Sequence, residues 1–321
     1  MSTIRYFSLA RQALVEGLRA INIQPGEAVA LPALICRDVL ASLSTVGARP
    51  VFYHVDEQLR PVSLPDEKGI RAVIAVNYFG FPQDLVPFIQ YCSARQAILI
   101  EDNAHGYLSA DESGQRLGTR SAIGITSIRK TIRIPDGAEL SINDSRLLAR
   151  IPDQLVATTH PINAFQLRRL AATIERRFNI PALRALRVVS RTVRLLRFGS
   201  PLPISSAASE TELLSIKGPH ASSLQLLGRL DPNAEIHRRI DTYAQVHTAL
   251  AALPLTPLFP TLPRGTVPYG YPFISDEPTM RAAERRVARL GVEIIKWPDL
   301  PDVITPAAPF HYTNLWLVNF L

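Results

Sequence analysis

The chain has 321 residues, of which 47% are hydrophobic and 20% are charged, so it can bury a sizeable core. This composition excludes a disordered protein, and no run of about 18 consecutive apolar residues predicts a transmembrane helix. The formal net charge of +7 raises the question of an anionic partner. Two cysteines, Cys36 and Cys92, are too few for a disulfide framework or a cysteine-based metal site. Because the N-terminus also lacks an apolar signal-peptide core, we expect a reduced, soluble, cytoplasmic protein without a metal site.

Helical and strand patterns alternate over residues 1–150. The expected helices are 8–21, 37–46 and 85–92, the expected strands are 29–31, 50–55, 72–76 and 97–100, and Pro25-Gly26 marks a turn. This alternation predicts an α/β fold with a mainly parallel central sheet that is covered by helices on both faces. In such sheets, functional side chains gather at the carboxyl ends of the strands.

The rest of the chain differs in composition. Nine arginines and a single acid, Glu175, lie between Arg168 and Arg197, within a segment over 147–198 that is expected to be helical. A Pro/Ser-rich connector at 199–209 precedes expected helices at 222–253 (broken near Pro232) and 278–290, and an expected strand at 292–296. We therefore predict a large domain over 1–205, with an Arg-rich helical insertion at about 150–200, and a linking helix plus a small C-terminal α/β domain over 206–321.

Two segments that follow expected strands carry reactive side chains. The first holds Glu101, Asp102 and His105, where a carboxylate could be a base, a metal ligand or the partner of a buried cation. The second runs from Ser127 to Lys130, one of only four lysines in the chain. A lysine held against apolar surroundings becomes a nucleophilic amine that can form a Schiff base. The Ser-x-x-Lys spacing also occurs in β-lactamases and penicillin-binding proteins, but their SDN and KTG elements are absent here.

Asp102 and Lys130, which lie 28 residues apart, together fit the chemistry of pyridoxal phosphate. This cofactor needs a lysine for its aldehyde, a carboxylate for its pyridine nitrogen and ligands for its phosphate. The charge-assisted hydrogen bond to the nitrogen is worth about 1.5–3 kcal/mol. Its larger effect is electronic, because a protonated ring accepts electrons from the substrate carbon.

The order and spacing of several segments resemble the fold-type I, pyridoxal-phosphate-dependent aminotransferases of the DegT/DnrJ/StrS sugar group. The matching segments are GEAVALPALICRDVLASLSTVGARPVFYHVD, VNYFGFPQD, IEDNAHG, GQRLGTRSAIGITSIRKTIRIPDGAELSIND and VEIIKWPDLP. The first is similar to the family's opening strand–helix–strand, the third to its cofactor aspartate motif and the fourth to its lysine segment. The resemblance covers 8–144 and, more faintly, 222–321.

The resemblance implies roles for the matched residues. Lys130 would bond to the cofactor aldehyde and then move the substrate proton as a general base. Asp102 would contact the ring nitrogen, and His105 would lie near the ring hydroxyl. The implied phosphate ligands are Ser127 and the backbone N–H groups of Ala10 and Arg11 at a helix N-terminus.

The residue at position 130 also bears on the reaction type. Family relatives that dehydrate sugars carry histidine in its place, so Lys130 favours transamination. An amino acid, usually glutamate, would load the cofactor, and the amino group would pass to a keto sugar carried on a nucleotide. The product would serve the synthesis of a polysaccharide or a secondary metabolite.

The chain departs from the family pattern at several places. Cys36 stands where an aromatic residue commonly stacks on the cofactor ring, and Gly218 stands where a neighbouring subunit's asparagine reaches the phosphate. The segment between Ser127 and Lys130 is shorter by two residues. The resemblance implies a homodimer with its sites near the subunit boundary. The alternative to an aminotransferase is a catalytically diverged protein that acts as a binding or regulatory module at an anionic surface.

The Arg-rich segment has no counterpart in the family. A helix over 182–196 would place Ala182, Leu186, Val189, Val193 and Leu196 on one face and Arg184, Arg187, Arg191 and Arg194 on the other. It could be an ordinary surface helix, or it could contact a membrane surface or another anionic partner weakly. Nucleic acid is not expected, because no aromatic interleaving or known binding motif accompanies the charge.

Overall fold

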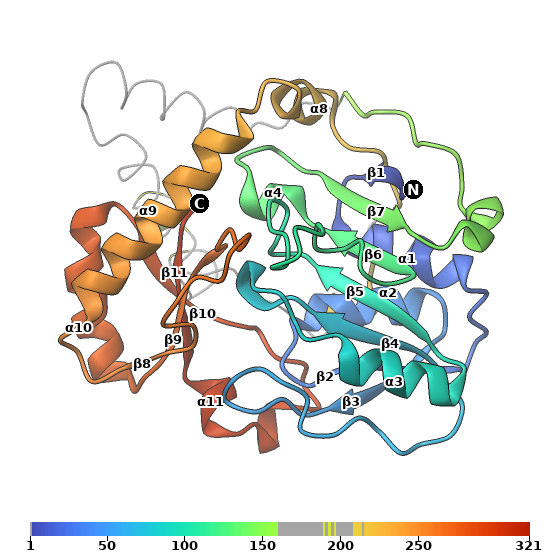
Figure 1. Cartoon of the computed structure of the whole chain (residues 1–321), viewed down its shortest axis with the longest axis horizontal. Helices are drawn as coiled ribbons and strands as arrows, with labels where there is room; N and C mark the ends of the chain where they lie inside the picture. Colours follow the sequence, from blue (N-terminus) through green and yellow to red (C-terminus); the bar gives the residue numbers. More distant parts are fainter. Residues whose placement is uncertain (1, 160–188, 190–191, 194–195, 197–207, 214) are drawn as a thin grey trace.

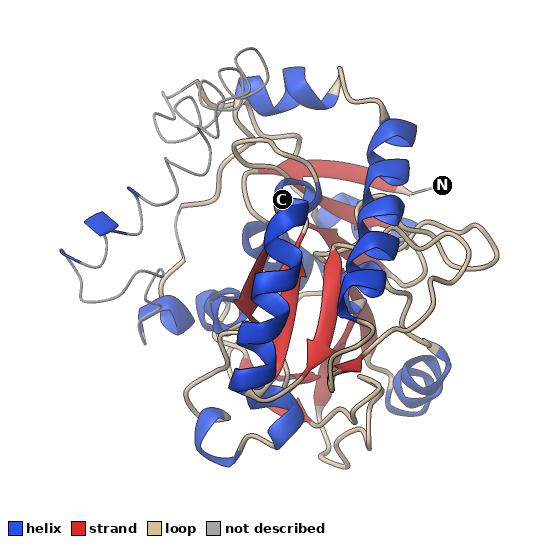
Figure 2. Ribbon diagram, turned by 90° about the vertical axis from the view of Figure 1, so that its left-hand side faces the viewer, coloured by secondary structure: helices blue, strands red, loops and turns tan. Residues whose placement is uncertain are grey.

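The computed structural model describes residues 2–159, 189, 192–193, 196, 208–213 and 215–321. These residues form a seven-stranded and a four-stranded sheet with helices packed against them (Figures 1 and 2). A continuous hydrophobic core includes residues of both sheets. In the part of the chain that is described, no helix is both long enough and apolar enough to cross a membrane.

The larger sheet carries the N-terminal half of the chain. Its strands are β1 (Thr3–Phe7), β2 (Ala28–Pro32), β3 (Arg49–Tyr53), β4 (Ile70–Val76), β5 (Ile98–Asn103), β6 (Ile123–Thr126) and β7 (Ala138–Ile142). They lie in the order β1-β7-β6-β5-β4-β2-β3. Strand β7 alone runs in the opposite direction to the other six strands. Strands such as β2 and β4 are apolar along almost their whole length because both faces of this sheet are covered. The predicted α/β fold with a mainly parallel central sheet is confirmed.

Helices cover both faces of this sheet, with α3 in front of it and α1 and α2 behind it in Figure 1. The helical elements of this half are α1 (Ala10–Ala20), η1 (Arg37–Val39), α2 (Leu40–Thr45), η2 (Tyr78–Gly80), α3 (Val86–Arg95), α4 (Ile128–Thr131) and η3 (Ser145–Arg150). Two residues separate the end of β1 from the start of α1, and one residue separates the end of β6 from the start of α4. Both helices therefore start at the edge of the sheet where functional side chains are expected.

The C-terminal part forms the four-stranded sheet. Its strands are β8 (Thr256–Pro257), β9 (Gly270–Ile274), β10 (Glu293–Lys296) and β11 (Leu315–Asn319), all antiparallel in the order β10-β11-β9-β8. The helical elements here are α7 (Ala208–Thr211), α8 (Ala221–Leu227), α9 (Pro232–Leu250), α10 (Glu277–Val287), η4 (Ala288–Leu290), η5 (Thr305–Ala307) and α11 (Phe310–Thr313). Helices α9 and α10 lie side by side against this sheet (Figures 1 and 2).

The helices and strands predicted within 8–100 are all found, with their ends shifted by a few residues. The break predicted near Pro232 in the helix over 222–253 is confirmed: α8 and α9 are separate helices, because the Asp231 side chain caps α9 and Pro232 begins it. Strands β1, β7, β8, β9 and β11 were not predicted. Lys130 lies in a helical turn and not at the end of a strand, because β6 already ends at Thr126.

The prediction of a helix from residue 147 is wrong for its described beginning. After η3, residues 151–159 contain no helix, and Thr158 instead pairs with His220 in an isolated bridge. The four residues Arg184, Arg187, Arg191 and Arg194 lie outside the described residues, as does the predicted domain boundary at 205 and 206. The domain limits therefore remain a prediction.

Candidate functional site

Lys130 lies on the short helix α4, at the carboxyl end of β6. The turn is anchored by the buried side chain of Ile128, which belongs to a small apolar cluster with Ile132 and Ile134. The Lys130 side chain is half-buried, and its Nζ atom lies 3.3 Å from Nε2 of His105. The predicted lysine and histidine, 25 residues apart in sequence, are therefore neighbours.

Asp102 lies near the end of β5, next to β6, and is buried. One oxygen, Oδ1, accepts a hydrogen bond from the Ala104 N–H at 2.9 Å. The other oxygen has no hydrogen-bond partner among the residues that the structure describes. Burial raises the pKa of Asp102, and the Ala104 N–H and the charge of Lys130 oppose that rise. Asp102 thus offers a free carboxylate oxygen, close enough to Lys130 for their charges to interact.

His105 is buried between two aromatic rings. Its ring lies parallel to that of Tyr269, with centroids 4.5 Å apart, and to that of Phe79, with centroids 5.6 Å apart. The Phe79 N–H donates to Nδ1 at 3.3 Å, and Phe79 holds a left-handed φ of 57°, which is rare for a bulky residue. Burial, and to a lesser extent the charge of Lys130, hold the pKa of His105 well below its ordinary value.

The hydrogen bond from Phe79 assigns the tautomer of His105. A neutral imidazole that accepts at Nδ1 carries its hydrogen on Nε2. Since Nε2 is the atom that faces Lys130, the hydrogen of this tautomer points toward the lysine amine. This geometry suits a lysine that acts as a nucleophile or a base.

The N-terminus of α1 presents the predicted phosphate ligands. Its first residues, Ala10 and Arg11, have backbone N–H groups that no acceptor in the described ranges satisfies, and no side chain caps the helix at Leu9. Ser127 is buried and follows β6, with its hydroxyl likewise unbonded within the described residues. The Arg11 guanidinium forms an ion pair with Asp38 at 2.9 Å. Free N–H groups at a helix N-terminus favour an anion such as phosphate.

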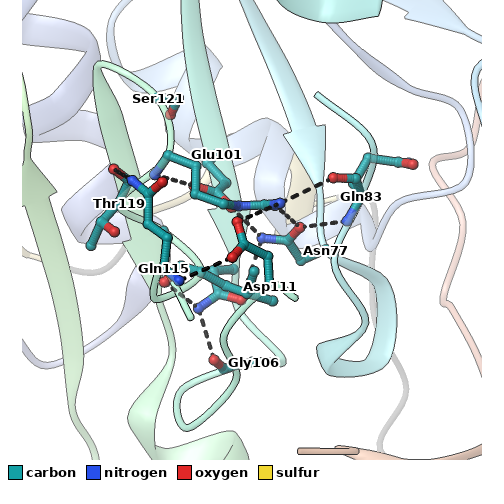
Figure 3. Close-up of polar contacts among 12 residues, drawn as sticks. Asn77, Gln83, Glu101, Gly106, Asp111, Gln115, Thr119 and Ser121 are labelled. Atoms are coloured by element: carbon teal, nitrogen blue, oxygen red, sulfur yellow. Dashed lines mark hydrogen bonds and ion pairs between the residues drawn. The ribbon is translucent and has the colours of Figure 1, made fainter. Parts of the chain in front are cut away.

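A buried polar network supports the ends of β4 and β5 (Figure 3). The Glu101 carboxylate accepts hydrogen bonds from Arg120 Nε at 2.8 Å, from the Arg120 backbone N–H at 3.0 Å and from Asn77 Nδ2 at 2.8 Å. Asn103 Nδ2 donates to the carbonyl groups of Gly106 and Leu117. Of the roles considered for Glu101, the structure shows the partner of a buried cation. The described residues contain no group of three or more His, Cys, Asp or Glu that could hold a metal ion.

The structure also gives an account of two of the departures from the family pattern. Cys36 is a free, half-buried thiol, and burial raises its pKa while the charge of Lys130 opposes that rise. A Cβ atom at Gly218 would lie 2.3 Å from the Val156 carbonyl oxygen, so position 218 has no room for an asparagine.

Sequence reasoning missed Tyr269 and Arg239. The only signal for Tyr269 was an aromatic run before β9, and nothing marked Arg239 among the chain's many arginines. Burial raises the pKa of the Tyr269 phenol to about 12. The tyrosine is therefore neutral, and its ring covers one face of His105.

Comparisons with known proteins place this site in context. Residues 7–158 match the model of the DegT/DnrJ/EryC1/StrS aminotransferase family. The chain is 28% identical over 145 residues to GDP-perosamine synthase of Escherichia coli O157:H7. This alignment covers 43% of this chain and 40% of that protein. It is 31% identical over 120 residues to UDP-N-acetyl-3-dehydro-alpha-D-glucosamine 3-aminotransferase of Acidithiobacillus ferrooxidans, covering 36% of this chain and 32% of that protein. The chain thus spans less than half the length of these relatives in the matched regions.

The whole fold also resembles solved structures. Spr1654 from Streptococcus pneumoniae, described as a sugar aminotransferase in its PLP form, superposes with a TM-score of 0.63. The likeness covers 98% of this chain and 81% of that one, at 15% sequence identity. The fold is therefore that of the pyridoxal-phosphate-dependent aminotransferases.

Proposed function

Because residues 7–158 match the model of the DegT/DnrJ/EryC1/StrS aminotransferase family, we propose that the chain is a pyridoxal-phosphate-dependent aminotransferase. The observation that carries the proposal is the position of Lys130, whose Nζ faces Nε2 of His105 beside the buried carboxyl group of Asp102. The alternative, a diverged binding module, is disfavoured because a protein without this chemistry has no need to keep a lysine amine and a neutral imidazole in contact.

The residues present fit the cofactor. When bound, pyridoxal phosphate supplies an aldehyde for a lysine amine and an aromatic ring that accepts electrons from the substrate carbon. Asp102 offers its free oxygen to the ring nitrogen, and the Nε2–H of His105 offers a donor to the ring hydroxyl. The phosphate would be held by Ser127 and by the N–H groups of Ala10 and Arg11.

Lys130 carries out the proton transfer. Its amine lies 3.3 Å from Nε2 of His105, and Lys130 would take a proton from the substrate carbon as a general base. A lysine at this position returns that proton to a carbon atom, and the outcome is exchange of an amino group. Asp102 keeps the ring nitrogen protonated, and its buried setting strengthens that hydrogen bond.

We propose an amino acid, most simply glutamate, as the donor and a keto sugar carried on a nucleotide as the acceptor. The support is the names of the two relatives described above, which refer to GDP- and UDP-linked sugars. The test is formation of 2-oxoglutarate from glutamate with a panel of GDP-, UDP- and dTDP-linked keto sugars. Turnover with free keto acids and with none of these sugars would overturn the acceptor assignment.

A spectroscopic experiment tests the cofactor assignment directly. Protein reconstituted with pyridoxal phosphate should show a visible absorption band that borohydride removes, and mass spectrometry should place the reduced cofactor on Lys130. Lys130→Ala should lose both the band and the activity, whereas Lys68→Ala, a matched control in an exposed turn, should keep both. A reducible band that persists in Lys130→Ala would transfer the role to another lysine.

We further propose a homodimer in the cytoplasm. The support is the family resemblance, which implies sites near the subunit boundary. Sedimentation at micromolar concentration should give twice the mass of 35.5 kDa. A fully active monomer would contradict the proposed dimer.

A weak contact with anionic lipid is proposed for the Arg-rich segment. The four residues Arg184, Arg187, Arg191 and Arg194 lie outside the described residues, and the support is their charge pattern alone. Near an anionic surface each arginine contributes about 1 kcal/mol. Co-sedimentation with anionic vesicles at low salt should exceed that with neutral vesicles and should fall at high salt. Equal binding by a variant with all four arginines changed to glutamine would refute the contact.

A further inference from the structure

Arg239, on helix α9, is completely buried, with 0% of its surface exposed. Its guanidinium donates from Nη1 to the carbonyl oxygens of Pro268 and Tyr269, both at 3.0 Å. Nη2 donates to the carbonyl oxygen of Thr131, and Nε donates to Glu235 at 2.8 Å. One side chain of the C-terminal part of the molecule therefore contacts three separate segments.

Two of these segments flank the reactive lysine. Thr131 directly follows Lys130 and ends the short helix α4, where a carbonyl group has no partner inside the helix. Tyr269 stacks on His105, whose Nε2 lies 3.3 Å from Lys130 Nζ. Arg239 thus joins the backbone that carries the lysine to the aromatic ring that orients its hydrogen-bond partner.

Two further hydrogen bonds connect Tyr269 to His105 through Phe79. The Tyr269 N–H donates to the Phe79 carbonyl at 2.8 Å, and the Phe79 N–H donates to His105 Nδ1. The planar guanidinium suits this position because it presents several donors in fixed directions, which a lysine ammonium cannot match. The pKa of Arg239 is lowered to about 10 by burial, with Glu235 opposing, so the group remains charged at neutral pH.

We propose that Arg239 is a positioning residue that holds the Lys130 amine against His105. The catalytic part of this role rests on the proposed aminotransferase function, whereas the orientation of Lys130 in the cofactor-free protein does not. Without the guanidinium, the Thr131 carbonyl loses its donor and α4 can move relative to Tyr269. The amine of Lys130 would then leave the contact with Nε2.

The test uses variants of two adjacent arginines. Arg239→Lys keeps a positive charge but cannot reach all three carbonyl groups, and Arg239→Gln removes the charge. Arg238→Gln is the matched control, because Arg238 also pairs with Glu235 but has an exposed side chain and does not contact α4. Thermal unfolding first establishes that each variant is folded.

The first measurement is the reactivity of Lys130 in the cofactor-free protein. Limited modification by an amine reagent, mapped by mass spectrometry with Lys68 as internal reference, should be altered at least about tenfold at Lys130 in Arg239→Lys, which corresponds to about 1.4 kcal/mol. Arg238→Gln should match the wild type. Unchanged reactivity at Lys130 in a folded Arg239→Lys would overturn the proposal.

The second measurement is kinetic. Because a displacement of about 1 Å at a reacting group can cost on the order of 100-fold in rate, kcat of Arg239→Lys should fall by roughly that factor with little change in KM. The pH profile of its visible absorption band should also shift, since a merely structural role would leave that profile in place. If the wild type shows no reducible band, the proposed function fails, but the reactivity measurement on Lys130 still decides the role of Arg239.

Discussion

Replacing Glu101 by glutamine should destabilise the protein much more than the same change at an exposed ion pair. The Glu101 carboxylate is fully buried, with 0% of its side chain exposed, and that of its partner Arg120 is 10% exposed. Both oxygens are used, because Oε1 accepts from Arg120 and Asn77 while Oε2 accepts from the Arg120 backbone N–H. Glutamine keeps only one oxygen, so at least one buried N–H group would face another donor.

The expected magnitude follows from these contacts. A buried donor without an acceptor costs about 1–3 kcal/mol, and removing one partner of a buried ion pair costs about 3–5 kcal/mol. Because glutamine is the same size and keeps part of the network, we expect the free energy of unfolding to fall by about 3 kcal/mol. With a denaturant slope of about 3 kcal/mol per molar urea, the unfolding midpoint would fall by about 1 M.

The assay is urea unfolding followed by circular dichroism, with Glu67→Gln as the matched control. Glu67 pairs with Arg49 at the surface, where the two side chains are 41% and 51% exposed, so its loss should cost less than about 1 kcal/mol. A double-mutant cycle between Glu101 and Arg120 should return a coupling of about 0.5–3 kcal/mol. If Glu101→Gln shifts the midpoint no more than Glu67→Gln does, the buried network does not stabilise the fold more than an exposed ion pair.

Two further predictions concern the site itself. Asp102→Asn should leave cofactor binding largely intact but lower turnover by orders of magnitude, because an amide cannot keep the ring nitrogen protonated; near-normal turnover would make Asp102 structural. The pKa of His105 in the folded protein lies below its ordinary value of about 6.5. As the pH falls below that value, the unfolded chain therefore binds a proton at His105 that the folded chain does not bind. The free energy of unfolding should then fall by about 1.4 kcal/mol per pH unit. Urea unfolding across pH should show this loss in the wild type and a shallower one in His105→Gln, whereas parallel curves would exclude His105 as the group responsible.

Much of the N-terminal sheet could be predicted from sequence because its strands and helices alternate with clear patterns. Strand β2 is an uninterrupted apolar run and β4 is apolar apart from Arg71, and parallel strands of this kind are buried on both faces. Strand β1 was missed because its five residues, Thr3–Phe7, mix polar and apolar side chains and gain their partner only from β7. A strand defined by a distant partner leaves little local signal.

Some residues of the candidate site could likewise be predicted from the sequence, and others could not. Asp102, His105 and Lys130 could be found because each lies within a few residues of the end of an apolar strand, and parallel strands bring these ends together. Tyr269 and Arg239 could not be found, because their relation to Lys130 comes from packing between the two sheets. The short helix at Lys130 was also missed, since one turn of helix has no periodicity to detect.

The residues that contact His105 and α4 come partly from outside the segment that matches the family. The family match stops at residue 158, yet the ring that covers His105 and the guanidinium that holds α4 come from Tyr269 and Arg239. Residues 7–158 contain the groups that would bond to a cofactor and His105, the contact of the Lys130 amine, but not Tyr269 and Arg239, which contact His105 and α4. Because a displacement of about 1 Å is costly in catalysis, the supporting residues of the C-terminal part constrain the chemistry as much as the matched motifs do. If the proposed role of Arg239 is right, a substitution far outside the family match would lower the activity of Lys130 without changing any residue that the motifs identify.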